Sequence, residues 1–217
     1  MKTIYLLLSL CLCILFIQPT QAQTDVGAGG DIQLGLKFSP VFSYSRIDNS
    51  SPDYDISRGG TGTKFAFGLV ADLPFGANYY FSTGLIYLPK GAKIDYTNKT
   101  TGESGTEKYK THYLQVPLTI KLRTNEIAES ISGYAQLGTA VDFKINDDTG
   151  GDKFIVEKFF FMDVSLVVGG GIMYDLPFGN TIGLGIMYQR GLINAARDGQ
   201  DIRLKKDLLV LDATFYF

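Results

Sequence analysis

Charged residues recur at alternate positions within otherwise apolar segments of this 217-residue chain. When such segments lie side by side in a sheet, residues at alternate positions face the same side. Enclosed together, the charges would form a network of ion pairs or a path for protons and ions, because an unpaired buried charge costs on the order of several kcal/mol. The residues that we assign to this network are Lys37, Lys64, Asp72, Lys121, Arg123, Asp142, Asp163, Asp175 and Asp212.

His112 is the only histidine, and it is the second candidate for chemistry. A lipid-modifying enzyme could use it together with Thr111 as a nucleophile and Glu107 as an acid. No nucleophile spacing supports that arrangement, and a single histidine near a membrane interface is more often simply a polar group. We therefore predict no catalytic residue and no enzymatic activity.

The segment with Asn146, Asp147, Asp148 and Asp152 offers the hard oxygen ligands that calcium prefers. Its spacing does not match an EF-hand loop, and acidic solvated loops are commoner than calcium sites. We therefore predict neither a metal site nor a cofactor.

The composition indicates one apolar domain. The 20 basic and 22 acidic residues nearly cancel and no basic run occurs, so nucleic acid is not an expected partner. Both cysteines, Cys11 and Cys13, lie in the leader described next, so the mature chain would carry no thiol and no cysteine-based metal site.

Residues 1–22 have the pattern of a secretory signal peptide. Lys2 precedes an apolar stretch from Ile4 to Ile17, and Thr20-Gln21-Ala22 supplies small residues before the cleavage point. The stretch is shorter than the roughly 20 residues that a spanning helix needs. The predicted mature domain is therefore 23–217.

Alternation with period two predicts that this domain consists of eight strands. Short connections alternate with long ones rich in Gly, Ser, Thr, Asn and Asp, as in an up-and-down barrel of even strand number, with both termini at the short-turn end. The predicted strands are 31–44, 63–73, 79–94, 107–123, 131–145, 158–175, 181–193 and 206–217.

One five-residue sequence occurs twice. Asp72-Leu73-Pro74-Phe75-Gly76 recurs as Asp175-Leu176-Pro177-Phe178-Gly179, and both copies should form equivalent hairpins in opposite halves of the barrel. Within a closed barrel the first and last strands meet, so Lys37 and Asp212 should be neighbours, while the two repeat aspartates should face Lys121 and Arg123. Pro117 lies within a strand and predicts a bulge or a lost ladder bond.

The side of the barrel that is apolar decides between a soluble and a membrane protein. A soluble lipocalin-like barrel turns its apolar face inward, whereas a membrane barrel turns it toward lipid. Large apolar side chains from eight strands would overfill the narrow interior, whereas the polar face carries small residues, so we predict a membrane barrel with a filled polar interior. The glycines expected to point inward are Gly35, Gly68, Gly84, Gly138, Gly169, Gly171, Gly183 and Gly185. The aromatic residues expected in outward girdles are Tyr79, Phe81, Tyr87, Tyr174, Tyr188, Phe215 and Phe217.

The segment Tyr113-Leu114-Gln115-Val116-Pro117-Leu118-Thr119-Ile120-Lys121-Leu122 resembles a strand motif of the outer-membrane β-barrel domain family of Bacteroidetes-type bacteria, often called PorT-like. The chain departs from the motif at Val116, where the family often has isoleucine. The alternation that ends in Phe215 and Phe217 also resembles the insertion signal of outer-membrane barrels. This resemblance implies outer-membrane lipid and the barrel-assembly machinery as partners.

We therefore predict a small outer-membrane protein of a Gram-negative bacterium, with extracellular long loops and periplasmic termini. Its expected role is structural or interactive, through its loops or its lipid face, within a larger outer-membrane complex. The alternatives are a narrow transport barrel, a lipid-modifying barrel enzyme and a soluble periplasmic lipocalin-like binding barrel. The residues of the first long loop that could contact a protein or glycan are Asp48, Asp53, Tyr54, Asp55 and Arg58.

Overall fold

Eight long strands form a barrel in the computed structural model, which describes residues 31–49, 54–58, 62–149, 158–159, 161–192, 196–197 and 202–217. The barrel strands are β1 (Gln33–Asn49), β3 (Gly62–Pro74), β4 (Tyr79–Asn98), β5 (Ser104–Ala128), β6 (Ile131–Thr149), β8 (Met162–Asp175), β9 (Thr181–Gly191) and β11 (Ile202–Tyr216). Three short strands accompany them, β2 (Tyr54–Arg58), β7 (Lys158–Phe159) and β10 (Ala196–Arg197).

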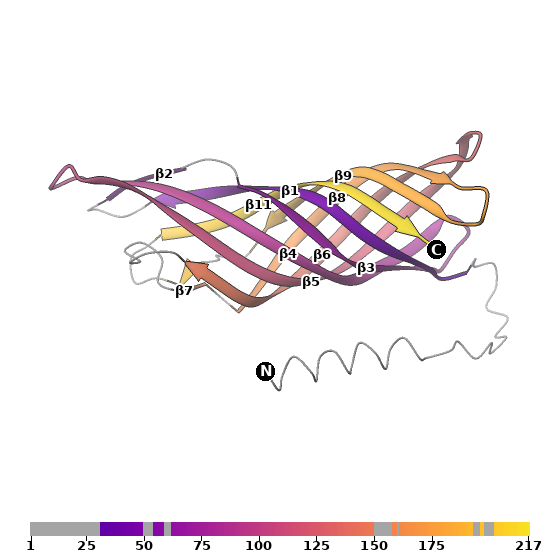
Figure 1. Ribbon diagram of the computed structural model, residues 1–217, viewed down its shortest axis with the longest axis horizontal. Helices are drawn as coiled ribbons and strands as arrows, with labels where there is room; N and C mark the ends of the chain where they lie inside the picture. The colour runs from indigo at the N-terminus through magenta and orange to yellow at the C-terminus, as the bar shows by residue number, and fades with distance from the viewer. Residues whose placement is uncertain are drawn as a thin grey trace.

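The barrel is closed and antiparallel throughout (Figure 1). Each barrel strand pairs with its neighbours in the chain, and β1 pairs with β11 to close the ring, with Leu36 opposite Phe215 and Val41 opposite Val210. This confirms the predicted eight-stranded up-and-down barrel. Within the described residues, no helix has the length and apolar character needed to cross a bilayer. The predicted signal peptide lies outside the described part of the chain.

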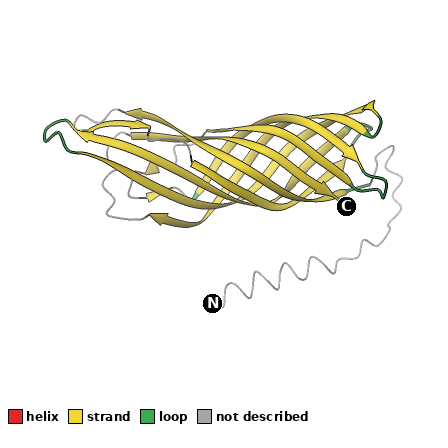
Figure 2. Cartoon of the chain, turned by 45° about the horizontal axis from the view of Figure 1, so that its top comes forward, coloured by secondary structure: helices red, strands yellow, loops and turns green. Residues whose placement is uncertain are grey.

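The short turns and the described ends of the chain lie at one end of the barrel (Figure 2). There the N–H of Phe217 donates a hydrogen bond to the carbonyl of Leu34. Strand β5 was expected to end at residue 123 but reaches Ala128, because two register shifts accommodate extra residues opposite β6. The remaining turn is tight, and Ser130 adopts a positive φ of 60°.

Pairing at the other end continues farther than the sequence predicted. The β4–β5 ladder extends to the pair Thr97 and Ser104, and β2 adds to the free edge of β4 between Tyr54 and Arg58. The segments 45–62 and 95–106 were expected to be loops, yet both contain strand. Aromatic and β-branched residues such as Ile94 and Tyr96 favour an extended backbone, which explains the extra pairing.

The apolar face of the strands points outward, as predicted. Phe65, Leu118, Ile120 and Leu184 are 53%, 41%, 53% and 50% exposed, whereas their polar neighbours along the strands are largely buried. Outward apolar residues occur on all eight barrel strands, and soluble monomers rarely expose such a large apolar surface. The outer surface therefore favours the membrane interpretation over a soluble periplasmic cup.

The interior holds an apolar cluster as well as the polar residues. It contains inward side chains from β3, β4 and β8, such as Val70, Leu88 and Met173, together with three tyrosines, Tyr113, Tyr134 and Tyr216. The polar face of the strands is thus mixed in character, although it is the inward one.

Inward glycines let neighbouring strands approach closely. A Cβ at Gly171 would lie 2.1 Å from the carbonyl oxygen of Leu184, and a Cβ at Gly68 would lie 2.3 Å from that of Leu85. Since both obstacles are backbone atoms, neither can move aside without a shift of the strand. These glycines are required by the narrow, strongly coiled barrel.

Pro117 interrupts the ladder without a bulge. Pairing between β4 and β5 skips Val116 and Pro117, yet the register is the same on both sides of the gap. The β1–β11 ladder shows a similar gap around Pro40, where the N–H of Ala213 donates to Oγ of Ser39 at 3.3 Å instead. The expectation of a lost ladder bond at Pro117 is confirmed, and a side chain partly compensates at Pro40.

The glycine contacts give a testable prediction for stability. We expect Gly171→Ala to lower the free energy of unfolding by about 1–3 kcal/mol, because the new methyl group overlaps backbone. Gly183→Ala is the matched control, since the nearest atom to its Cβ is a tyrosine ring carbon at 3.4 Å. Urea unfolding in detergent micelles measures both. Equal losses for the two variants would show that the close approach at Gly171 does not constrain the barrel.

Candidate functional site

The charged residues of the interior form layers of ion pairs across the barrel. In the layer nearer the short turns, Lys37 on β1 pairs with Asp212 on β11, and Lys121 on β5 pairs with Asp72 on β3 at 2.5 Å. All four side chains are buried. The structure therefore brings together Lys37 and Asp212 across the closing seam, as the closed barrel required.

Two inward tyrosines complete this layer. The hydroxyl of Tyr134 donates to Asp212 at 2.9 Å, and the Lys121 ammonium donates to the hydroxyl of Tyr216 at 2.6 Å. The ammonium also lies 5.0 Å from the ring centroid of Tyr216 and 5.4 Å from that of Tyr134, within the range of cation–π attraction. Gly185 leaves room for Tyr134, because a Cβ there would lie 2.3 Å from the phenol oxygen.

The two repeat aspartates have equivalent partners. Asp72 accepts a hydrogen bond from the hydroxyl of Ser82 at 2.5 Å, and Asp175 accepts one from Thr181 at 2.6 Å. Asp175 also pairs with Arg123 at 2.5 Å, just as Asp72 pairs with Lys121. Each copy therefore joins a hydroxyl on the following strand to a cation on β5.

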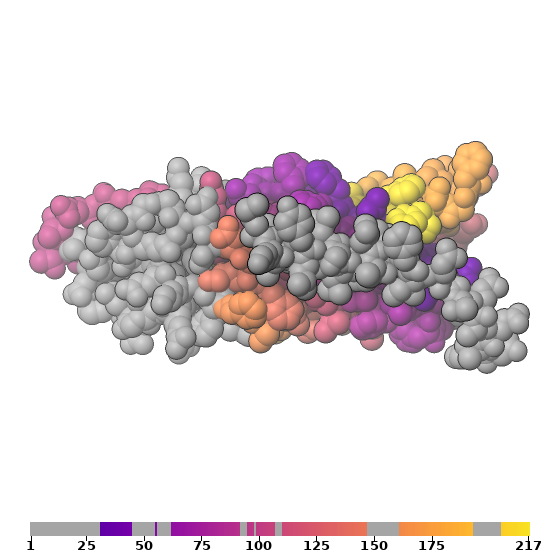
Figure 3. All heavy atoms as spheres, turned by 60° about the horizontal axis from the view of Figure 1, so that its bottom comes forward, coloured from indigo at the N-terminus to yellow at the C-terminus, as the bar shows by residue number. Residues whose placement is uncertain are grey.

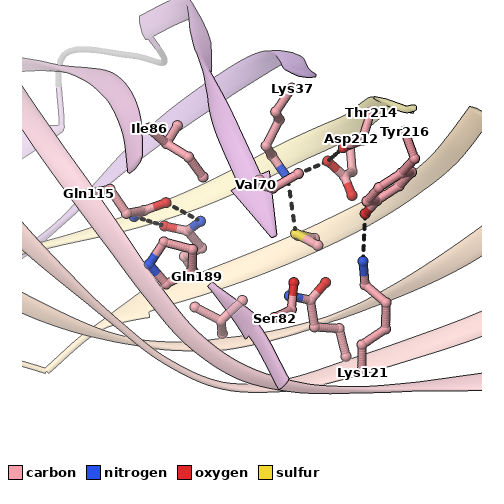
Figure 4. Close-up of a pocket in the computed structure, with 14 residues that line it drawn as sticks. Lys37, Val70, Ser82, Ile86, Gln115, Lys121, Gln189, Asp212, Thr214 and Tyr216 are labelled. Carbon is pink, nitrogen blue, oxygen red and sulfur yellow. Dashed lines mark hydrogen bonds and ion pairs between the residues drawn. The ribbon is translucent and has the colours of Figure 1, made fainter. Parts of the chain in front are cut away.

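An amide pair separates this layer from the loop side of the barrel (Figure 4). Nε2 of Gln115 donates to Oε1 of Gln189 at 3.0 Å and to Asp142 at 2.7 Å. The cavity beside this pair, lined by Lys37, Lys121 and the two glutamines among others, has a volume of about 20 Å³. That is close to the minimum space for one water molecule, so the described side chains fill the barrel at this level.

Lys90 organises the layer on the loop side. Its ammonium lies 2.6 Å from Asp142 and 2.9 Å from Asp163, and 4.7 Å from the ring centroid of Tyr113. Lys206 lies nearby, where it donates to the hydroxyl of Thr111 at 2.9 Å. Lys90 therefore holds together two carboxylates that would otherwise repel each other in a buried setting.

Sequence reasoning missed both Lys90 and Lys206. Lys90 follows Ile86 and Leu88 on the inward face of β4, so the strand is apolar on both faces and its alternation is hidden. Counting in steps of two from buried Ser82 would have placed Lys90 inside. In the ion-paired interior, Lys37, Lys90, Lys121 and Arg123 pair with Asp72, Asp142, Asp163, Asp175 and Asp212.

We also assigned Lys64 to this network. It is half-buried on β3, and no ion pair joins it to another of the residues that the structure describes.

His112 faces outward and contacts Tyr87. Its Nδ1 lies 2.6 Å from the hydroxyl of Tyr87, and the two rings stack with centroids 5.8 Å apart. Thr111, its proposed nucleophile, is fully buried on the opposite face of the strand. The grouping with Thr111 is therefore wrong, because successive strand residues point to opposite faces. The side chain of Glu107 lies outside the described part of the chain.

The other candidate residues in the long loops fall largely outside the described side chains. This holds for Asp147, Asp148 and Asp152 of the acidic segment, and Asn146 stands at an exposed position on β6. Among the described residues no cluster of His, Cys, Asp or Glu is arranged to hold a metal. In the first loop, Asp55 is exposed on β2, and the side chains of Asp48, Asp53, Tyr54 and Arg58 are not described.

Comparison with known families identifies the barrel. The family model described as "Outer membrane protein beta-barrel domain" matches residues 21–197. The chain belongs to this family. It is therefore an outer-membrane β-barrel protein, which explains the apolar outer surface. A search of curated proteins found no match.

Three solved structures match the chain, and the first of them shares its fold. Neisserial surface protein A matches with a TM-score of 0.51 and 11% identity, over 88% of this chain and 98% of that one. Outer membrane protein AlkL matches with a TM-score of 0.44 and 14% identity, over 93% and 97%. The attachment invasion locus protein of Yersinia pestis matches with a TM-score of 0.34 and 14% identity, over 88% and 100%.

The position of Lys90 gives a second prediction. We expect Lys90→Met to reduce the free energy of unfolding by about 3–5 kcal/mol, because it leaves Asp142 and Asp163 buried without a cation. Denaturant titration in lipid vesicles measures the loss. Lys64→Met is the control and should change stability by about 0.5 kcal/mol or less.

A rescue variant tests the cause of that loss. Adding Asp142→Asn and Asp163→Asn to Lys90→Met removes the uncompensated charges, so we expect much of the stability to return. If Lys90→Met proves as harmless as Lys64→Met, the ion-paired layer is not a structural element of the barrel.

Proposed function

We propose that the protein is a sealed outer-membrane barrel whose role is to present an interaction surface outside the cell. The observation that carries this proposal is the filled interior. Ion pairs and an amide pair occupy successive levels of the barrel, and the cavity between them is about 20 Å³, too small for a solute. The described side chains leave no passage for a transported solute. We therefore assign the function to the exposed surfaces of the barrel.

The proposed interaction surface is the sheet formed by β2 and the extended ends of β4 and β5. Its tip, between Thr97 and Thr106, is polar, largely exposed and marks one extremity of the molecule in Figure 3. The hydroxyl of Thr106 donates to Asp95 at 2.5 Å, and the ring of Tyr96 lies against Gly105. These contacts give the hairpin a defined shape, and a preformed surface lowers the entropy cost of binding.

The polar character of this surface favours a hydrophilic partner, either a protein or a glycan. We propose a larger outer-membrane complex as its setting, with the long-loop end extracellular and both termini periplasmic. The resemblance of residues 113–122 to PorT-like barrels of Bacteroidetes-type bacteria supports that setting. A cleaved leader at 1–22 and an insertion signal at Phe215 and Phe217, recognised by the barrel-assembly machinery, complete the proposed route into the membrane.

The filled interior predicts an absence of ion conductance. Purified protein inserted into planar bilayers should give no stepwise current at moderate voltage, because the ion-paired layers leave no continuous water path. Gly183→Ala, which leaves those layers intact, should be equally silent. Reproducible unitary steps from the native protein would contradict the proposal and favour a narrow transport barrel.

The extended hairpin supplies the second test. Residues 97–104 can be replaced by an Asn-Gly turn, which suits a two-residue hairpin loop and shortens β4 and β5 only at their outer ends. We expect the trimmed variant to fold and to lose co-purification of its partner from native membranes by roughly tenfold, equivalent to about 1.4 kcal/mol.

Phe178→Ser is the matched control for that experiment. Phe178 is 91% exposed at a short turn, at the opposite end of the barrel. Its replacement should leave co-purification unchanged. If the two variants have the same effect, the hairpin is not the interaction surface.

A further inference from the structure

The outer surface carries a shallow apolar groove over β5, β6 and β8. The groove has a volume of about 330 Å³, and side chains of Ile120, Leu122, Ala135, Leu137 and Val168 line it. It lies within the lipid-facing surface that family membership places in the outer membrane. No residue of the ion-paired interior contributes a charge to it.

Small residues create the groove. Ala135 on β6 is the cross-strand partner of both Leu122 on β5 and Gly170 on β8. Across these three outward positions, the side chain therefore shrinks from leucine on β5 to the methyl group of alanine on β6, and it is absent at the glycine on β8. The larger side chains of Leu137 and Val168 stand beside this low part, so the surface is hollowed where the rest of the apolar face is raised.

Polar groups follow the groove toward the short-turn end. Thr124 lies two positions beyond Leu122 on β5, and its hydroxyl accepts a hydrogen bond from the N–H of Gly133 at 2.8 Å. The amide of Asn78 donates to Oδ1 of Asn125 at 3.3 Å. Thr124 and Asn125 are exposed, so a polar rim follows the apolar groove on this side. A phospholipid has the same sequence of parts, an acyl chain followed by a polar headgroup.

We propose that this groove binds one acyl chain of a membrane phospholipid, with the headgroup beside Thr124 and Asn125. The occupant follows from the position of the groove, since the surface around it is continuous with the membrane contact of the barrel. If no lipid filled the groove, the side chains that line it would lose dispersion contacts. The site is independent of the interaction role proposed for the extended hairpin.

A single tryptophan can report occupancy, because the chain has none. Leu137→Trp places the reporter on the groove wall, and Leu36→Trp places it on β1, on an outward position exposed to a similar extent. Each variant, purified in detergent micelles, is titrated with dibrominated phosphatidylethanolamine, whose bromine atoms quench tryptophan. We expect half-quenching of Leu137→Trp at about fivefold lower lipid concentration, equivalent to about 1 kcal/mol.

Filling the groove should remove the difference between the reporters. Ala135→Leu, added to Leu137→Trp, should raise the half-quenching concentration to that of Leu36→Trp. Ala213→Leu, also added to Leu137→Trp, places the same atoms at an outward position on β11. It should leave the low half-quenching concentration of Leu137→Trp unchanged. Heat-dependent gel mobility verifies that each barrel is folded.

Two results would overturn the proposal. Equal quenching of Leu137→Trp and Leu36→Trp would show ordinary lipid contact without a site. A change in Leu137→Trp emission that follows protein concentration and ignores added lipid would assign the groove to a second copy of the chain.

Discussion

The narrow bore of an eight-stranded barrel is the constraint on which the rest of this structure depends. Every strand must point half of its side chains inward, and the enclosed space accepts only small residues or side chains that bind one another. The chain meets this constraint with glycines at close strand contacts, with inward tyrosines, and with cations matched to carboxylates. Because each carboxylate of these ion pairs lies within hydrogen-bonding distance of a cation, the interior is held together by interactions that would be costly to leave half made.

The repeated aspartates show how local sequence is converted into barrel geometry. Asp72 and Asp175 each precede a short turn, and each binds a hydroxyl on the returning strand and a cation on β5. The turns themselves differ, since Gly179 has a positive φ of 82° and Gly76 does not. The equivalence therefore resides in the aspartate and its partners, while the backbone of the turn is free to vary.

Much of the fold could be predicted from the sequence, because alternation identifies both the strands and their faces. The partner of Lys37 followed from closure of the ring, and that of Asp72 from its position near the same rim as Lys121. Lys90 was missed because Ile86 and Leu88 make the inward face of β4 apolar, which hides the period that alternation relies on. The extra pairing of β2 and the β4–β5 hairpin was missed because polar, glycine-containing segments are expected to be loops. Thr111 and His112 were grouped by adjacency, although adjacent strand residues point apart.

The seam between β1 and β11 has a consequence for how the molecule reaches its folded state. The partner of Lys37 lies 175 residues farther along the chain, so the pair cannot form until the final strand arrives. Contacts of such long range slow folding, because loop closure must precede them. A chain that stopped short of β11 would keep an exposed strand edge and a cation without its counter-charge. Completion of synthesis is thereby coupled to closure, and truncated products remain open and vulnerable to proteases.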